Sequence, residues 1–260
     1  MLILNAAKNT IQSVLNKLGW EVRRYYLSDM LQLCSFLEQQ RIDLVLDVGA
    51  NIGQFGERLF QAGFQGRLVS FEPLSSAHMK LSETAKRYPK WSVAPRAAVG
   101  RQAGETVINI SANMVSSSLL PIRGEHVDSA PSSRYVGTEI TKVITLDDYL
   151  NESDGARVFL KLDTQGFEFE ALKGAEHLLA SSIVGLQTEF SLAPLYDGQA
   201  DYLELLSWLR DRDFHPWALS SEFSDAQTSR LLQANIVLFR SKSSYSQAVR
   251  PKSLQPKTSA

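Results

Sequence analysis

The sequence lacks several features that define specialised classes of protein. Its 260 residues include a single cysteine, Cys34, so no disulfide can form within the chain and a disulfide-stapled secreted scaffold is excluded. No apolar run reaches the roughly 18 residues that a membrane-spanning helix needs. The N-terminal stretch has no basic segment before a long apolar block, which is unlike a cleaved signal peptide. We therefore expect a cytoplasmic globular protein without a transmembrane segment.

An excess of charge of one sign is also missing. The chain carries 27 basic and 28 acidic side chains, for a formal net charge of −1. Nucleic-acid-binding proteins usually carry a strong basic excess, because the release of phosphate counterions drives their association. The four histidines form no His-x-x-x-His pair and no cysteine-rich motif occurs, whereas a catalytic zinc needs converging ligands of these types. We therefore expect neither a nucleic-acid partner nor a metal site.

What the chain does contain is an alternation of apolar strands and amphipathic helices from residue 42 onwards. Strands are expected at 42–50, 66–73, 91–100, 157–163, 183–190, 215–220 and 233–240, and helices at 54–63, 75–88, 167–180 and 201–212. This alternation predicts a parallel sheet covered by helices on both faces. Residues 101–145 interrupt it with two β-prone runs around a polar segment. We expect them to form an insertion that covers the active site.

The two ends of the chain differ from this central part. Residues 1–41 show helical patterns at Leu4–Leu18 and Asp29–Gln40, which predict an N-terminal helical extension that docks on the domain or on a second subunit. Residues 241–260 carry four basic side chains, no acidic ones and many serines, which predicts a disordered tail. The remaining residues, 42–240, are expected to form one cofactor-binding domain.

The sharpest local motif is the turn DVGANIG at 47–53, between an expected strand and helix. Gly49 and Gly53 allow a sharp turn and leave room for a ligand against the backbone. Glu72 ends the next strand, where a carboxylate is well placed to accept hydrogen bonds from both hydroxyls of a ribose. Together these residues predict a nucleoside-binding unit.

The choice of nucleoside depends on Asn51 and Asp47. The dinucleotide fingerprint G-x-G-x-x-G has glycine where this chain has Asn51, so a pyrophosphate fits poorly. Asp47 suits a ligand with a positive group, and S-adenosylmethionine carries an ammonium and a sulfonium but no phosphate. An NAD-dependent oxidoreductase on the same sheet remains the alternative, although no Tyr-x-x-x-Lys pair supports it.

The motifs resemble those of the FkbM-type methyltransferases, which are class I S-adenosylmethionine enzymes. In the order of that family, the chain contains DVGANIG (47–53), FEP (71–73), SSSLL (116–120), TLDDYL (145–150), KLDTQGFEFEALKGA (161–175) and TEFSLAPLYDGQ (188–199). The resemblance covers about residues 42–240. It implies an α/β, Rossmann-like fold with a seven-stranded, mostly parallel sheet, helices on both faces and an antiparallel last strand.

The resemblance also implies how S-adenosyl-L-methionine is bound. Residues of the glycine turn are expected to line its methionine end, one carboxylate its ribose and two small residues its adenine. The residues at the methionine end are Asp47, Gly49, Asn51 and Gly53. The carboxylate at the ribose is Glu72, and the small residues at the adenine are Ala97 and Ala98.

A second cluster is expected to carry the chemistry. Lys161 and Asp163 share one face of a strand, and Asp163 lies at its carboxyl end, where such sheets hold their ligands. Transfer to a hydroxyl requires an aligned acceptor and removal of its proton. Asp163 is the first candidate for that base, and otherwise it holds the cofactor ammonium or caps the next helix. Glu189 either shares the acceptor pocket or stabilises a loop, and His126 in the insertion is a second candidate base.

These expectations combine into one function. We expect an S-adenosylmethionine-dependent methyltransferase that methylates a hydroxyl of a small-molecule or glycan acceptor, such as a sugar or a secondary metabolite. A third possibility is a non-catalytic module that binds S-adenosylmethionine and a partner chain. The carboxylates at the strand ends, Asp163 and Glu189, argue against it.

Overall fold

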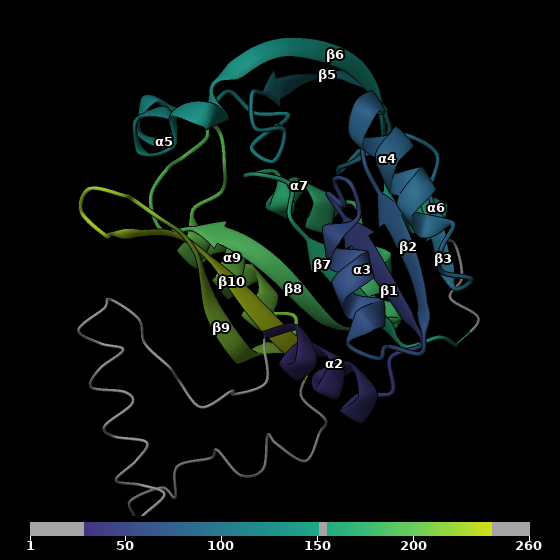
Figure 1. Ribbon diagram of the computed structural model, residues 1–260. Helices are drawn as coiled ribbons and strands as arrows, with labels where there is room; N and C mark the ends of the chain where they lie inside the picture. The colour runs from purple at the N-terminus through teal and green to yellow at the C-terminus, as the bar shows by residue number, and fades with distance from the viewer. Residues whose placement is uncertain (1–28, 151–154, 241–260) are drawn as a thin grey trace, which may run out of the picture.

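The computed structural model describes residues 29–150 and 155–240 (Figure 1). The helix expected at Leu4–Leu18 and the disordered tail expected at 241–260 lie outside these residues. The second N-terminal pattern forms helix α2 (Asp29–Gln39), as the sequence predicts. Within the described ranges, no helix has the length and apolar character needed to cross a membrane.

The main sheet has seven strands in the order β3-β2-β1-β7-β8-β10-β9. The strands are β1 (Leu44–Val48), β2 (Arg67–Phe71), β3 (Trp91–Val93), β7 (Val158–Leu162), β8 (Ile183–Ser191), β9 (Phe214–Ser224) and β10 (Leu231–Arg240). Strand β10 pairs antiparallel with both of its neighbours, whereas the other pairs are parallel. The sheet has the seven-stranded, mostly parallel, α/β Rossmann-like arrangement that the sequence predicts. The chain order reverses between β1 and β7, and ligands of such sheets bind at the carboxyl ends beside that point.

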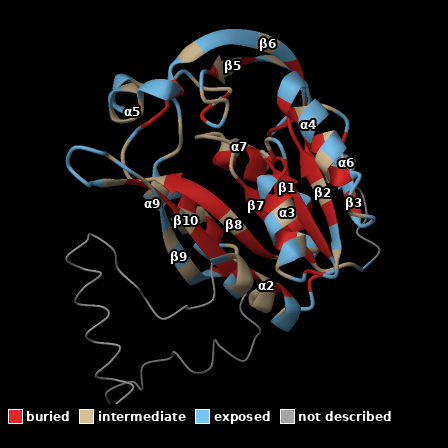
Figure 2. Cartoon of the chain, in the orientation of Figure 1, coloured by how far each residue is buried: buried red, intermediate tan, exposed pale blue. Residues whose placement is uncertain are grey.

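Helices cover both faces of the sheet. On one face lie α2, α3 (Gln54–Gln61) and α4 (Ser75–Ala85), and on the other lie α6 (Leu146–Tyr149), α7 (Glu168–Lys173), α8 (Glu176–Ser181) and α9 (Tyr202–Arg210). Strand side chains alternate between the faces, so Val45 packs under the first group while Leu44 and Leu46 pack under the second. Figure 2 shows the resulting pattern, with buried central strands and helices exposed on their outer sides.

Two elements differ from expectation. The helix expected over 167–180 is broken into α7 and α8 at Gly174, where the backbone passes so close to Gly100 that a Cβ would collide with its carbonyl oxygen. The strand expected over 91–100 ends at Val93, because Pro95 lacks the N–H that a continuing ladder needs. Its remainder forms β4 (Ala98–Val99), which belongs to a second sheet.

The second sheet is built mainly from the insertion at 101–145. It has three strands in the order β4-β6-β5, with β5 at Gly104–Ser111 and β6 at Tyr135–Ile144. Between β5 and β6 lie α5 (Gly124–Ser129) and a short 3₁₀ turn, η1 (Pro131–Ser133). In Figure 1 this sheet arches over the top of the molecule, above α4 and α7. The insertion thus lies where it can form a wall of a site at the strand ends.

Candidate active site

A cavity of about 640 Å³ lies at the carboxyl ends of β1, β7 and β8. This volume falls within the range of roughly 300–1,000 Å³ that small-molecule sites occupy. Its walls come from helices α2 and α3, the turn after β1, the end of β2, the loop after β7, strands β8 to β10, and the insertion. The insertion contributes Asn113 to Leu119 and His126, so it forms part of the cavity wall.

The glycine turn forms one wall with its backbone. Gly49 has a left-handed conformation (φ 76°), and a Cβ at this position would collide with the carbonyl oxygen of Asp163. Only glycine fits such a close approach of two backbones. Asn51 is also left-handed (φ 49°), and its side-chain oxygen accepts a hydrogen bond from the next backbone N–H. The backbone from Val48 to Asn51 therefore faces the cavity.

Glu72 links the ends of β1 and β2. Its Oε2 accepts a hydrogen bond from the backbone N–H of Asn51 and its Oε1 one from Leu74, both at 2.8 Å. Burial raises the pKa of this carboxyl to about 7, although the two hydrogen bonds oppose the shift. Each carboxylate oxygen has a second lone pair, so Glu72 keeps acceptor capacity toward the cavity that it lines.

Asp47 and Lys161 form an ion pair below this wall. Asp47 is fully buried, and its Oδ1 lies 3.1 Å from Lys161 Nζ. The two atoms form an ion pair, but Oδ1 accepts no hydrogen bond from a described residue. Its Oδ2 accepts a hydrogen bond from Ser70 (3.0 Å), which in turn accepts one from the indole of Trp91. The Asp47 carboxylate is therefore engaged by protein groups, and neither Asp47 nor Gly53 is among the described residues that line the cavity.

Lys161 reaches from this ion pair to the cavity floor. Its ammonium donates a hydrogen bond to the carbonyl of Gly49 (3.2 Å) and lies 3.5 Å from Asp163 Oδ2. Burial opposes its charge, but the carboxylates of Asp47 and Asp163 outweigh burial and raise the pKa of Lys161. Lys161 therefore stays positively charged and acts as an ion-pair partner of the two carboxylates. It does not transfer protons.

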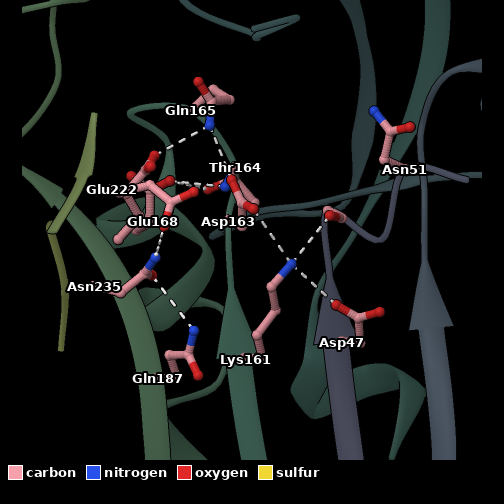
Figure 3. A network of polar contacts seen from close by, with 12 residues as sticks. Asp47, Asn51, Lys161, Asp163, Thr164, Gln165, Glu168, Gln187, Glu222 and Asn235 are labelled. Carbon is pink, nitrogen blue, oxygen red and sulfur yellow. Dashed lines mark hydrogen bonds and ion pairs between the residues drawn. The ribbon is translucent and has the colours of Figure 1, made fainter. Parts of the chain in front are cut away.

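Gln165 connects Asp163 with Glu189, and Figure 3 shows Gln165 above Asp163 in the loop after β7. Its amide nitrogen donates hydrogen bonds to Asp163 Oδ1 (2.9 Å) and to Glu189 Oε2 (3.1 Å). Its amide oxygen accepts one from the hydroxyl of Tyr196 (2.8 Å), and its backbone oxygen one from Ser118 (2.7 Å). The loop after β7, the loop after β8 and the insertion thus meet at one residue, Gln165.

Glu189 and Glu168 are both buried, but they differ in their surroundings. Glu168 Oε1 accepts hydrogen bonds from the backbone N–H groups of Thr164 and Gly166 and from the Thr164 hydroxyl, so Glu168 fixes the loop after β7. Glu189 lines the cavity. Burial first, and then the neighbouring carboxylates, raises its pKa well above the usual range.

His126 is enclosed at the upper end of the cavity. Its ring packs against Tyr196 (centroids 5.2 Å apart) and Phe223 (5.5 Å) and is only 3% exposed. Its Nδ1 has no hydrogen-bond partner among the described residues. Burial lowers its pKa to about 4, so the imidazole is neutral at pH 7.

Strands β8, β9 and β10 add a polar wall that the sequence analysis did not identify. Asn235 on β10 donates a hydrogen bond to Glu222 on β9 (2.8 Å) and accepts one from Gln187 on β8 at 3.5 Å. Gln233, two residues before Asn235, donates to Glu189 Oε2 (2.9 Å). The sequence did indicate this wall. Gln233 and Asn235 stand two residues apart in an otherwise apolar strand, so their side chains share one face.

Residues 47–216 match the methyltransferase FkbM domain. The chain belongs to the FkbM methyltransferase family. No curated protein matches the chain in sequence.

Several solved structures share the fold of this FkbM methyltransferase at low identity. An rRNA methylase from Streptococcus thermophilus is 14% identical with a TM-score of 0.45, over 84% of this chain and 99% of that one. A Streptococcus pneumoniae protein in complex with S-adenosyl-L-methionine is 15% identical with a TM-score of 0.46, over 84% and 75% of the two chains. TehB from Haemophilus influenzae is 10% identical with a TM-score of 0.44, over 81% and 62%. Similarities this distant say nothing about the acceptor.

Most of the FkbM motifs meet at the cavity. Its lining includes residues from DVGANIG, FEP, SSSLL, KLDTQGF and the TEF segment, together with Ala97 and Ala98. The TLDDYL motif lies elsewhere, where Asp147 accepts hydrogen bonds from the first backbone N–H groups of α8, those of His177 and Leu178. Among residues 29–150 and 155–240, no group of three or more His, Cys, Asp or Glu side chains is arranged to hold a metal ion.

Proposed function

We propose that this FkbM methyltransferase uses S-adenosylmethionine to methylate a hydroxyl of a polar acceptor, such as a sugar, a glycan or a hydroxylated secondary metabolite. The observation that carries the proposal is one continuous cavity. It joins a glycine turn and a buried carboxylate, which suit a nucleoside cofactor, to a wall of amides and carboxylates, which suits a hydroxylated acceptor.

The cofactor end of the cavity fits S-adenosylmethionine. Gly49 lines the cavity in a turn that closes tightly against the backbone of Asp163, and Glu72 has acceptor capacity for the two hydroxyls of a ribose. Ala97 and Ala98 add small apolar surface suited to adenine. When bound, the cofactor supplies an electrophilic methyl group on a positively charged sulfur. Asp47 and Gly53 contribute by holding the turn in shape.

The acceptor end fits a molecule with several hydroxyls. Amide and carboxylate groups both bind hydroxyls, and here they stand on neighbouring strands that are rigidly paired. The cations among the described lining residues are Arg58 and Lys161, and Lys161 is neutralised by Asp47 and Asp163. This balance of charge favours an uncharged or amine-bearing acceptor over a phosphorylated one, whose anionic groups the carboxylates repel.

A direct test of the cofactor is calorimetry on the purified full chain with S-adenosylmethionine and, separately, with NAD. We expect S-adenosylmethionine to bind and NAD not to bind, since Asn51 stands where the dinucleotide fingerprint has the glycine that lets a pyrophosphate approach the backbone. Glu72→Gln should weaken binding by removing a ribose acceptor, whereas Glu83→Gln, on the exposed side of α4, should not. Binding of NAD without S-adenosylmethionine would overturn the proposal.

A second experiment tests the reaction. Cell-extract fractions are incubated with the protein and S-adenosylmethionine labelled in its methyl group, and the labelled product is then treated with base. A base-stable label on a sugar-containing or other polyhydroxylated fraction is the expected result, because methyl ethers resist base while methyl esters release methanol. Binding of the cofactor without transfer to any fraction would instead identify a non-catalytic binding module.

A further inference from the structure

The carboxylates of Asp163 and Glu189 are joined by one amide, and its orientation is fixed. The nitrogen of Gln165 donates one N–H to each carboxylate, while the hydroxyl of Tyr196 donates to the amide oxygen. A flipped amide would turn its oxygen toward two carboxylate oxygens, which is repulsive. The two acids are therefore held on the same amide group in a fixed geometry.

The two acids nevertheless have opposite environments. The side chain of Asp163 is 42% exposed, and its Oδ2 lies 3.5 Å from the ammonium of Lys161. Glu189 is 4% exposed, and Lys161 acts on it only weakly. The charged groups around Glu189 are otherwise Asp163, Glu168 and Glu222, all of which oppose its ionisation. Pairs of acids whose environments differ in this way commonly divide the acid and base roles of an active site.

The hydrogen bonds of Glu189 also distinguish its two oxygens. Oε2 accepts two amide N–H groups, from Gln165 at 3.1 Å and from Gln233 at 2.9 Å. These bonds occupy the lone pairs of Oε2. No described residue donates a hydrogen bond to Oε1. When Glu189 takes up a proton, that proton therefore goes to Oε1.

We propose that Oε1 of Glu189, and not the carboxylate of Asp163, takes the proton from the acceptor hydroxyl. The inference rests on the function proposed above. As the acceptor O–H bond breaks, its proton moves to Oε1, and the oxygen electron pair forms the bond to the methyl carbon. The methyl–sulfur bond breaks with its electron pair left on sulfur, and Glu189 later returns the proton to solvent. Asp163 takes no part in this proton transfer and keeps its contacts with Lys161 and Gln165.

This assignment changes the order of candidates that the sequence suggests. A carboxylate in water is a weak base for a hydroxyl, and a general base works best when its pKa lies near the working pH. Burial raises the pKa of Glu189 toward that range, whereas the carboxylate of Asp163 is already engaged in an ion pair with Lys161. Gln165 and Gln233 act as positioning residues, because they determine which oxygen of Glu189 is free.

The first test follows the protonation of Glu189 and requires no acceptor. The full chain is labelled with ¹³C at glutamate and aspartate side-chain carboxyls, and their NMR signals are followed with pH. Glu189→Gln, Asp163→Asn and Glu170→Gln identify the signals, Glu170 being a partly exposed glutamate outside the cavity. We expect Glu189 to titrate well above the ordinary range of a glutamate side chain, because it is buried among carboxylates. A Glu189 signal that titrates within that ordinary range would overturn the assignment whether or not an acceptor is known.

The second test measures transfer to the acceptor isolated from the labelled fractions. Glu189→Gln should lower kcat by roughly 10²–10⁴-fold, the usual contribution of a general base, and remove the fall in kcat at acidic pH. Asp163→Asn should keep that acidic limb, and Glu170→Gln should match the wild type. Retention of S-adenosylmethionine binding by Glu189→Gln shows that the variant is folded. The opposite result would be that Asp163→Asn removes the fall in kcat at acidic pH and Glu189→Gln keeps it. That result would assign the base to Asp163, while the proposed function would stand.

Discussion

Lys161 Nζ lies 3.1 Å from Asp47 Oδ1, and the two residues are direct cross-strand partners on β7 and β1. The ion pair is buried at the point where the chain order of the sheet reverses. Through its hydrogen bond to the carbonyl of Gly49, the same ammonium supports the glycine turn from below. The strand pair that defines the binding site is therefore held together by charge as well as by its backbone ladder.

Removing one partner of this ion pair should be costly. Lys161→Met leaves the Asp47 carboxylate buried without its counter-charge, and such changes typically lower the free energy of unfolding by about 3–5 kcal/mol. The double variant Asp47→Asn with Lys161→Met should recover part of that loss, because no uncompensated charge remains. Urea unfolding of both single variants and the double variant measures the coupling. A loss below about 1 kcal/mol for Lys161→Met would equal that of an exposed pair and contradict the role assigned to it.

The glycine turn offers a matched pair of substitutions. Gly49 and Gly63 both have positive φ, but a Cβ at 49 collides with the backbone of Asp163, whereas a Cβ at 63 meets open space. Gly63→Ala should therefore lose about 1–2 kcal/mol of stability from backbone strain alone, and Gly49→Ala clearly more. We also expect Gly49→Ala to abolish S-adenosylmethionine binding while Gly63→Ala preserves it. Thermal unfolding and calorimetry measure the two effects, and equal losses at both positions would show that the close approach is unimportant.

Glu72 should make stability depend on pH. Its pKa is raised from 4.5 to about 7 in the folded protein, so between these values the folded state binds more protons than the unfolded chain. The stabilising contribution of its protonated form is complete below about pH 4.5 and is lost as the pH rises to about 7, with a limit near 3 kcal/mol. Urea unfolding of the wild type and of Glu72→Gln at pH 5 and pH 8 isolates this contribution, since Glu168 and Glu189 are common to both proteins. A wild type and a variant with the same pH dependence would contradict the prediction.

His126 should respond to pH with the opposite sign. Burial lowers its pKa from 6.5 to about 4, so the unfolded chain binds more protons than the folded one between these values. Its contribution to stability is present above about pH 6.5 and is lost as the pH falls toward 4. His126→Phe should remove this dependence and retain methyl transfer, because the proton acceptor assigned here is Glu189. A 100-fold or larger fall in kcat, measured on the acceptor from the labelled fractions, would restore His126 as the base.

Much of the architecture follows from the sequence because it depends on local patterns. Apolar runs such as 44–48, bounded by turns and separated by amphipathic helices, specify buried parallel strands. The motifs then place the site at the carboxyl ends of β1 and β7. Gly49 was identifiable for the same reason, since its left-handed conformation is a local property of the turn.

The contacts that distinguish the acids depend on distant pairings, which local patterns do not specify. Glu189 meets Gln233 only because β10 pairs with β8 in a register that sets Asn235 opposite Glu189. The strand position of Asp47 likewise gave no indication that its carboxylate turns toward Lys161 and away from the cavity. The break at Gly174 depends on the close passage of Gly100, which is remote in sequence.

The contacts between Ser118, Tyr196 and Gln165 have a consequence for how such enzymes diverge and how they are engineered. An insertion taken from another methyltransferase would have to supply a hydroxyl that reaches the Gln165 carbonyl and leave the Tyr196 hydroxyl its place beside the Ser116 carbonyl. A graft chosen only for its acceptor preference would loosen the amide between the two acids and so lower turnover along with changing selectivity. Specificity and rate are therefore expected to evolve together here, through compensating changes in three separate segments of the chain.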